Sequence, residues 1–170
     1  PVDFLLAHCA EKAGGKVVRI PTPLPQHDHE DITVGWEEKI TSKSKVLAIC
    51  HPHNPLGFYY SASQLQQISD FAKKHNLILL SDEVWSDVVL QGSLVSMRNV
   101  DEQCWVVYGL SKGFGIAGLR IGALICPSPE QRDALALECG YIHTTEGAST
   151  LSQMAGVAAM GDPHILRQFI

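Results

Sequence analysis

The chain has 170 residues, of which 45% are hydrophobic and 18% charged, and its formal net charge is −5. A chain of this size and composition can bury a sizeable core, and we expect residues 1–170 to form one α/β domain. The acidic balance argues against a nucleic-acid partner, and the apolar runs are too short to span a bilayer. No leader-like segment opens the sequence, so we expect a soluble, cytoplasmic protein without a membrane partner.

Helical and strand patterns alternate along the chain, as a parallel α/β domain requires. Ser61 and Gln64 form a capping-box pattern, and the apolar residues that follow at helical spacing predict a helix with its stripe in the core. The expected helices cover residues 4–13, 36–42, 61–75, 129–139 and 149–160. The expected strands cover residues 16–20, 45–50, 77–81, 104–108 and 121–126. The last two are short and apolar, as buried strands are.

Five cysteines and eight histidines raise the question of a metal site or disulfides. The cysteines are odd in number and lack Cys-x-x-Cys spacing, so we expect small buried hydrophobes in a reducing compartment. The histidine pairs at 27/29 and 51/53 have no third ligand at helical spacing, and we expect no metal there. The cysteines are Cys9, Cys50, Cys104, Cys126 and Cys139.

The segment from residue 111 to residue 122 places a lysine before a glycine-rich stretch that leads to an arginine. A lysine amine attacks a carbonyl only without its proton, and a partly buried, glycine-crowded setting would lower the pKa of Lys112 by desolvation. The planar fork of Arg120 suits a phosphate, and Gly113, Gly115 and Gly118 let the backbone approach a bulky ligand. The pattern suggests an aldehyde that bears a phosphate. A surface lysine before an ordinary glycine-rich loop fits these residues equally well.

Two upstream segments favour the ligand-binding interpretation. Asn54 lies between two prolines after the apolar run 46–50, although an ordinary turn would also accept it. Asp82 and Glu83 follow the apolar run 77–80, where a carboxylate is costly unless it is paired or hydrogen-bonded. Ligands of open parallel sheets bind at the carboxyl ends of the strands, so Asn54, Asp82 and Lys112 are expected to converge at one edge.

The three motifs, in this order and spacing, resemble the large domain of the fold-type I pyridoxal-phosphate enzymes, the aminotransferase class I/II family. The residues around His53 and Asp82 are most similar to the branch of cystathionine β-lyase-like C–S lyases and their aminotransferase relatives. The resemblance covers about residues 1–160. It implies a three-layer αβα fold with a mostly parallel sheet, pyridoxal 5'-phosphate as cofactor, a small-molecule amino-acid substrate and a homodimer.

The resemblance also implies a role for each matched residue. Lys112 would form the Schiff base with the cofactor aldehyde and shuttle the substrate α-proton, while Asp82 would keep the pyridine nitrogen protonated. Asn54 would donate a hydrogen bond to the 3′ oxygen of the cofactor, and Arg120 would hold its phosphate. Ser111 would orient the lysine segment.

Other positions depart from the family pattern or border the site. Trp85 stands where the family carries a tyrosine or histidine, and its indole can only donate through one N–H. Gly109 replaces a phosphate-contacting serine or threonine, and Asp3 stands where an aromatic ring stacks on the cofactor. These departures predict a weaker grip on the cofactor. His53 is expected to line the mouth of the site.

Family members are more than twice as long as this chain, so the resemblance implies the central part of a truncated large domain. We expect the N-terminal segment and the small domain, with its carboxylate-binding arginine, to be absent. Two functions remain open: an enzyme that acts through Lys112 as aminotransferase or C–S β-lyase, and a catalytically inactive remnant that serves as a folded or interaction module.

Overall fold

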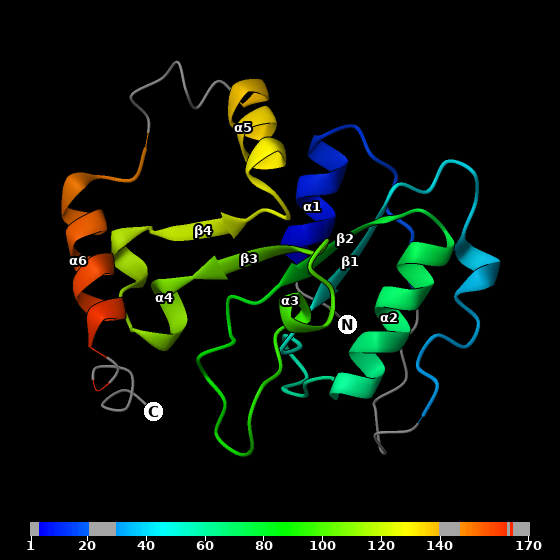
Figure 1. The fold of residues 1–170 in the computed structure, drawn as a ribbon, viewed down its shortest axis with the longest axis horizontal. Helices are drawn as coiled ribbons and strands as arrows, with labels where there is room; N and C mark the ends of the chain where they lie inside the picture. The colour runs from blue at the N-terminus through cyan, green and yellow to red at the C-terminus, as the bar shows by residue number, and fades with distance from the viewer. Residues whose placement is uncertain (1–3, 21–29, 140–146, 163, 165–170) are drawn as a thin grey trace.

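A computed structural model describes residues 4–20, 30–139, 147–162 and 164 of the chain. Its centre is a four-stranded sheet with the order β1-β2-β3-β4 (Figure 1). The first three strands are parallel, and β4 runs antiparallel to β3. The α/β fold with a mostly parallel sheet is thus confirmed. The strands are β1 (Val46–Cys50), β2 (Ile78–Asp82), β3 (Trp105–Gly109) and β4 (Gly122–Ile125).

Helices and short 3₁₀ turns connect these strands, and their places agree with four of the five expected helices to within about a turn. The fifth, expected over 36–42, is only a 3₁₀ turn. The α-helices are α1 (Phe4–Lys12), α2 (Ala62–Lys74), α3 (Met97–Val100), α4 (Leu110–Gly113), α5 (Pro129–Glu138) and α6 (Thr150–Gly161). The 3₁₀ turns are η1 (Glu37–Lys39) and η2 (Ala117–Leu119).

Helix α2 begins with the capping box that its sequence predicts. The hydroxyl of Ser61 accepts a hydrogen bond from the Gln64 backbone N–H, and the Gln64 side chain accepts one from the Ser61 backbone N–H. Two of the orphan donors at the helix start are thereby satisfied. The apolar stripe that follows is buried, as expected.

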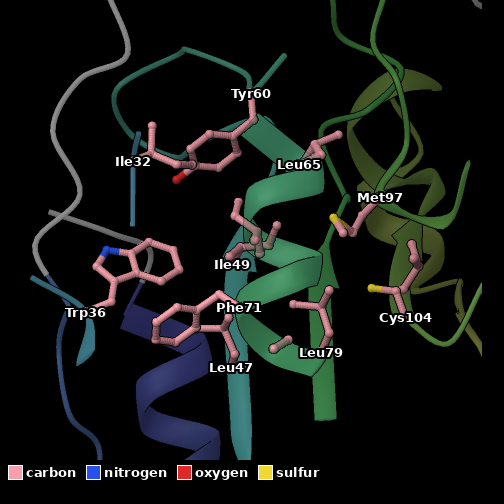
Figure 2. Close-up of a cluster of buried hydrophobic side chains, with 13 residues drawn as sticks. Ile32, Trp36, Leu47, Ile49, Tyr60, Leu65, Phe71, Leu79, Met97 and Cys104 are labelled. Carbon is pink, nitrogen blue, oxygen red and sulfur yellow. The ribbon is translucent and has the colours of Figure 1, made fainter. Parts of the chain in front are cut away.

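The main core lies between α2 and the first strands (Figure 2). Leu65 and Ile68 on α2 are fully buried, and Phe71 packs edge-on against Trp36 with 5.3 Å between the ring centroids. Such an edge-to-face pair adds to the stabilisation that burial itself provides. The described residues of this cluster are Ile32, Trp36, Leu47, Ile49, Tyr60, Leu65, Ile68, Phe71, Ala72, Leu79, Met97, Cys104 and Val106.

The opposite end of the molecule is covered less well. A second cluster under α6 contains only three buried residues among those described: Leu110, Phe114 and Ala159. All four residues of β4 are exposed, which contradicts the prediction of a buried strand over 121–126. The physical reason is its position: β4 is an edge strand that pairs with β3 alone, so its short apolar run does not imply burial.

Two other predictions are wrong. Residues 16–20 pair with no strand in the described part of the chain, and Val18 is about half exposed, so this run of β-branched residues forms no strand there. The expectation that all cysteines are buried holds for Cys50 and Cys104 but fails for Cys9 and Cys139, which lie exposed on α1 and after α5. Short amphipathic helices have an outer face, and a small thiol is tolerated there.

Candidate active site

The register of the sheet brings the three predicted motifs to the carboxyl ends of neighbouring strands. Cys50 at the end of β1 pairs with Asp82, and Asp82 pairs with Val107 on β3. Asn54 follows Cys50 by four residues, and Lys112 follows Val107 by five. The motifs therefore leave adjacent parallel strands at their carboxyl ends, where open α/β sheets bind ligands. The adjacent strand ends are those that the sequence predicts, and a shared site of Asn54, Asp82 and Lys112 stays a prediction.

Asn54 lies in the loop after β1, which is held by contacts of Asn54 and of its neighbour His53. The Asn54 backbone N–H donates to the Cys50 thiol at 3.4 Å, and the ring of His53 stacks on Phe58 with centroids 4.7 Å apart. His53 is half-buried, and this burial lowers the pKa of its imidazole. The loop thus presents a neutral ring and an amide beside the end of β2.

His51 fastens this loop to the rest of the fold. Its fully buried ring accepts a hydrogen bond from the Tyr60 backbone N–H at Nδ1 and donates one to the Val95 carbonyl through Nε2, 2.9 Å away. These two partners require the neutral tautomer with its proton on Nε2. Burial accordingly lowers the pKa of His51.

The two carboxylates after β2 have separate surroundings. Glu83 is buried and accepts hydrogen bonds from the Ser81 hydroxyl and from the Met97 backbone N–H, at 3.0 and 2.8 Å. It therefore ties β2 to the start of α3. Asp82 is also buried, and its Oδ1 accepts from the Val84 backbone N–H at 3.2 Å. The sequence singled out both acids, but only the structure separates their tasks.

Lys112 lies on α4, directly after β3, with its side chain exposed. Its Nζ lies 4.8 Å from the centroid of the Trp85 ring, within the range of a cation–π contact. The expected partial burial of Lys112 is therefore wrong: α4 is a single turn, and its lysine projects outward instead of into the core. The contact nevertheless joins the lysine motif to the turn that follows β2.

Packing and backbone conformation within the chain account for some of the glycines around Lys112. A Cβ on Gly113 would lie 2.4 Å from the Cβ of Asp87, so no side chain fits there. Gly109 faces Val84, and Gly118 borders open space. The close approach of the Asp87 side chain thus explains Gly113 without a cofactor. Gly115 has a φ of +66°, a backbone conformation that favours glycine.

Ser111 directly precedes the lysine, and Arg120 follows it by eight residues. Arg120 has left-handed backbone angles, and its exposed guanidinium donates to the Ala117 carbonyl at 2.9 Å. Ser111 is half-buried on α4. The planar face of the arginine is therefore available at the surface of η2, next to the lysine segment in sequence. Asp3 and the histidines at 27 and 29 lie outside the described residues.

The residues at this edge fit the chemistry that pyridoxal phosphate requires. An exposed primary amine, a buried carboxylate and an amide follow three neighbouring strands, and an exposed arginine lies eight residues after the lysine. The amine can react with an aldehyde, the carboxylate can hold a proton on a ring nitrogen, and the arginine can pair with a phosphate.

Comparison with known families agrees with this chemistry. The family profile described as aminotransferase class I and II matches residues 6–170. The chain belongs to this family. Enzymes of the aminotransferase class I and II family depend on pyridoxal 5'-phosphate, so both the resemblance and the cofactor expected from the sequence are confirmed. The expected branch of cystathionine β-lyase-like enzymes remains a prediction.

Individual aminotransferases resemble the chain over most of its length. The aspartate aminotransferase of Pinus pinaster is 34% identical over 94% of this chain and 33% of its own length. The bifunctional aspartate aminotransferase and glutamate/aspartate-prephenate aminotransferase of Petunia hybrida is 32% identical over 83% of this chain and 30% of its own. The chain therefore spans about a third of the length of these relatives.

A solved aminotransferase structure has the same arrangement of elements. A double mutant of the Thermus thermophilus aspartate aminotransferase matches with a TM-score of 0.82 and 28% identity, over 96% of this chain and 42% of that one. Within the described residues, no helix has the length and apolar character of a membrane span. No three His, Cys, Asp or Glu side chains in that part of the chain cluster as metal ligands would.

Proposed function

We propose that this chain is a pyridoxal-phosphate domain of an amino-acid aminotransferase and that Lys112 is the residue that carries the cofactor. The observation that supports the proposal most directly is the contact of the Lys112 Nζ with Trp85, 4.8 Å from its ring centroid. Trp85 lies three residues after Asp82. The contact brings the amine to the turn that follows the buried carboxylate, and it supports a site at the carboxyl ends of the strands, where open α/β sheets bind ligands.

Two residues would perform the proton chemistry. When bound, pyridoxal phosphate supplies an aldehyde for amines and a ring that withdraws electrons from the substrate Cα. The Lys112 Nζ would bind the aldehyde carbon, whose oxygen leaves as water, and, once the substrate amine has taken its place there, would accept the proton from Cα. The buried carboxylate of Asp82 would hold a proton on the ring nitrogen, which preserves the ring as an electron acceptor.

The remaining site residues would bind and orient. Asn54 would donate its amide to the 3′ oxygen, and Arg120 would pair its guanidinium with the phosphate. Ser111, on the same turn of helix as the lysine, would orient that segment. Trp85 would pack against the lysine and offer one N–H donor in place of a phenol or imidazole.

Transamination is the reaction that the relatives favour. The relatives compared with the chain carry the name aminotransferase, including the alanine aminotransferase of Mycobacterium tuberculosis, 35% identical over 67% of this chain. C–S β-elimination begins with the same loss of the Cα proton, and only the resemblance around His53 and Asp82 supports it. We therefore propose an amino acid as substrate and transamination as the reaction, in a cytoplasmic homodimer.

Reductive trapping tests the central assignment. The purified protein is mixed with pyridoxal phosphate, reduced with borohydride, digested and analysed by mass spectrometry. We expect the pyridoxyl group on the peptide that contains Lys112, together with absorbance in the near ultraviolet or visible range before reduction. Lys112→Ala should abolish the label. Lys43→Ala, which removes another exposed lysine, is the matched control and should leave the label unchanged.

Two results would contradict the proposal. A label distributed over the exposed lysines at similar yield would show that Lys112 has no special reactivity. A folded protein that stays colourless with excess cofactor and takes up no label would favour the second hypothesis, a catalytically inactive module. A circular dichroism spectrum and a cooperative unfolding transition establish that the protein in this assay is folded.

A further inference from the structure

The turn that follows β2, residues 84–87, contacts the lysine segment at three successive points, and we call it the β2 turn. A Cγ of Val84 lies 3.4 Å from the position of a Cβ on Gly109. The ring of Trp85 lies under the Lys112 Nζ. The Cβ of Asp87 lies 2.4 Å from the position of a Cβ on Gly113. One short turn thus follows the lysine helix from its N-cap to its last residue.

The short helix α4, which carries Lys112, depends on contacts with other parts of the chain for its stability. α4 spans only Leu110–Gly113, and no side chain caps its N-terminus. A single helical turn has one or two internal hydrogen bonds and is unstable in isolation. Lys112 itself is exposed, so no surrounding core fixes its direction. The position of its amine therefore depends on the groups that pack against α4.

Asp87 is the residue of the β2 turn that joins α4 to the sheet. Its Oδ2 accepts a hydrogen bond from the Tyr108 hydroxyl at 2.7 Å, and its Cβ packs against Gly113. Tyr108 belongs to β3. Burial, with the carboxylate of Asp87 as an additional cause, raises the pKa of Tyr108, so the phenol remains a donor at every physiological pH. Deprotonation of Tyr108 therefore does not break the hydrogen bond to Asp87 in this pH range.

We infer that Asp87 is a positioning residue for Lys112: anchored by Tyr108 and seated against Gly113, it holds the β2 turn so that Trp85 directs the lysine amine toward the Asp82 end of β2. The inference rests on the proposed function of Lys112, because only a reactive lysine gives this geometry a catalytic purpose. Asp87 touches neither cofactor nor substrate in this scheme. It acts through the placement of Trp85 and α4.

The first test uses the cofactor-free protein. Competitive labelling with acetic anhydride, followed by peptide mass spectrometry, measures the reactivity of each lysine in the folded chain. In Asp87→Ala and in Tyr108→Phe, the β2 turn loses its anchor and Trp85 leaves the ammonium group. We expect Lys112 to acylate about two- to fivefold faster, the size of an exposed cation–π contact. Lys43 and Lys45, both exposed in another part of the chain, are internal references that should not change.

The second test measures capture of the cofactor. With subsaturating pyridoxal phosphate and borohydride, Asp87→Ala and Tyr108→Phe should incorporate about tenfold less pyridoxyl at Lys112, as expected for a misplaced reacting group. Asp87→Asn keeps the Cβ contact and an acceptor for Tyr108, so it should restore both readouts to near the wild-type values. Asp133→Ala removes an exposed aspartate on α5 and is the matched control.

The outcomes separate the two proposals. If the wild-type protein takes up no pyridoxyl but the acylation rate of Lys112 still responds to Asp87→Ala, the positioning role stands and the proposed function fails. If Lys112 captures the cofactor equally well in wild type, Asp87→Ala and Tyr108→Phe, the positioning role is overturned. A loss of thermal stability without any change in either labelling rate would also overturn it, because Asp87 would then support only the fold.

Discussion

Asn54 follows β1 and Asp82 ends β2, two strands that pack against α2, whereas Lys112 and Arg120 belong to a part of the molecule with fewer buried side chains. Among the described residues, the cluster around α2 contains thirteen buried side chains and the cluster beneath α6 only three. Figure 1 shows these two helices at opposite ends of the sheet. The candidate active site lies on the border between them.

The difference shows how each half of the site is held. On the α2 side, buried polar groups are tied into the core: His51 bridges two segments, and Glu83 joins β2 to α3. On the α6 side, apolar side chains face outward, with Leu151 and Val157 about 70% exposed or more. Helix α4 is anchored on this side by Leu110, and the contacts of Asp87 with Gly113 and of Trp85 with Lys112 join it to the turn after β2.

The largest expected effect contrasts two leucines on helices. Leu65 on α2 is completely buried, and Leu151 on α6 is 75% exposed. Leu65→Ala should lower the free energy of unfolding by about 2–5 kcal/mol, because it leaves a cavity in a packed core. Leu151→Ala should change it by less than about 0.5 kcal/mol. Urea titration followed by circular dichroism measures both, and equal losses would remove the contrast between the two regions.

A smaller loss is expected when the buried acid after β2 is removed. Glu83→Ala leaves the Met97 backbone N–H and the Ser81 hydroxyl without their acceptor. The free energy of unfolding should fall by about 1–3 kcal/mol, the cost of buried groups that lose a partner. The control is Glu138→Ala at the exposed end of α5, which should be neutral. A neutral Glu83→Ala would show that this acid does not fasten α3.

The pH dependence of stability provides a third contrast. Burial lowers the pKa of His51 in the folded state, so its contribution to stability is complete above the ordinary histidine pKa and is lost as the pH falls. The free energy of unfolding should therefore decrease between about pH 7 and pH 5. His51→Gln should flatten this part of the profile, whereas His8→Gln, at an exposed position on α1, should preserve it. A wild-type profile that rises toward pH 5 would contradict the assignment.

The smallest effect concerns two aspartates. Burial tends to raise the pKa of Asp101, but hydrogen bonds from Ser69 and Gln103 and the charge of Lys73 outweigh it, so the pKa lies below the ordinary value. The contribution of this carboxylate is therefore complete above about pH 4 and is lost at lower pH. Asp101→Asn should reduce the acid sensitivity of the melting temperature. Asp133→Asn, in an exposed ion pair, should leave it unchanged.

Local rules predicted the elements whose signals are complete in the sequence. The Ser61 cap, the apolar stripe after it and the run before Asp82 each contain their own start, periodicity and end, and the structure confirms them. The run at 16–20 has the composition of a strand but no partner among the described residues. Strand formation depends on a neighbour, which composition alone does not supply.

The sequence by itself determined the order of the motifs and, through the parallel strands, their convergence at one edge. It also determined the family, because residue types at three separated places share one chemistry. Only the tertiary structure decided that Lys112 is exposed, that β4 is an edge, and that Asp87 occupies the space beside Gly113. The physical reason is that burial and close approach depend on segments far apart in the chain, whereas capping and periodicity are properties of neighbouring residues.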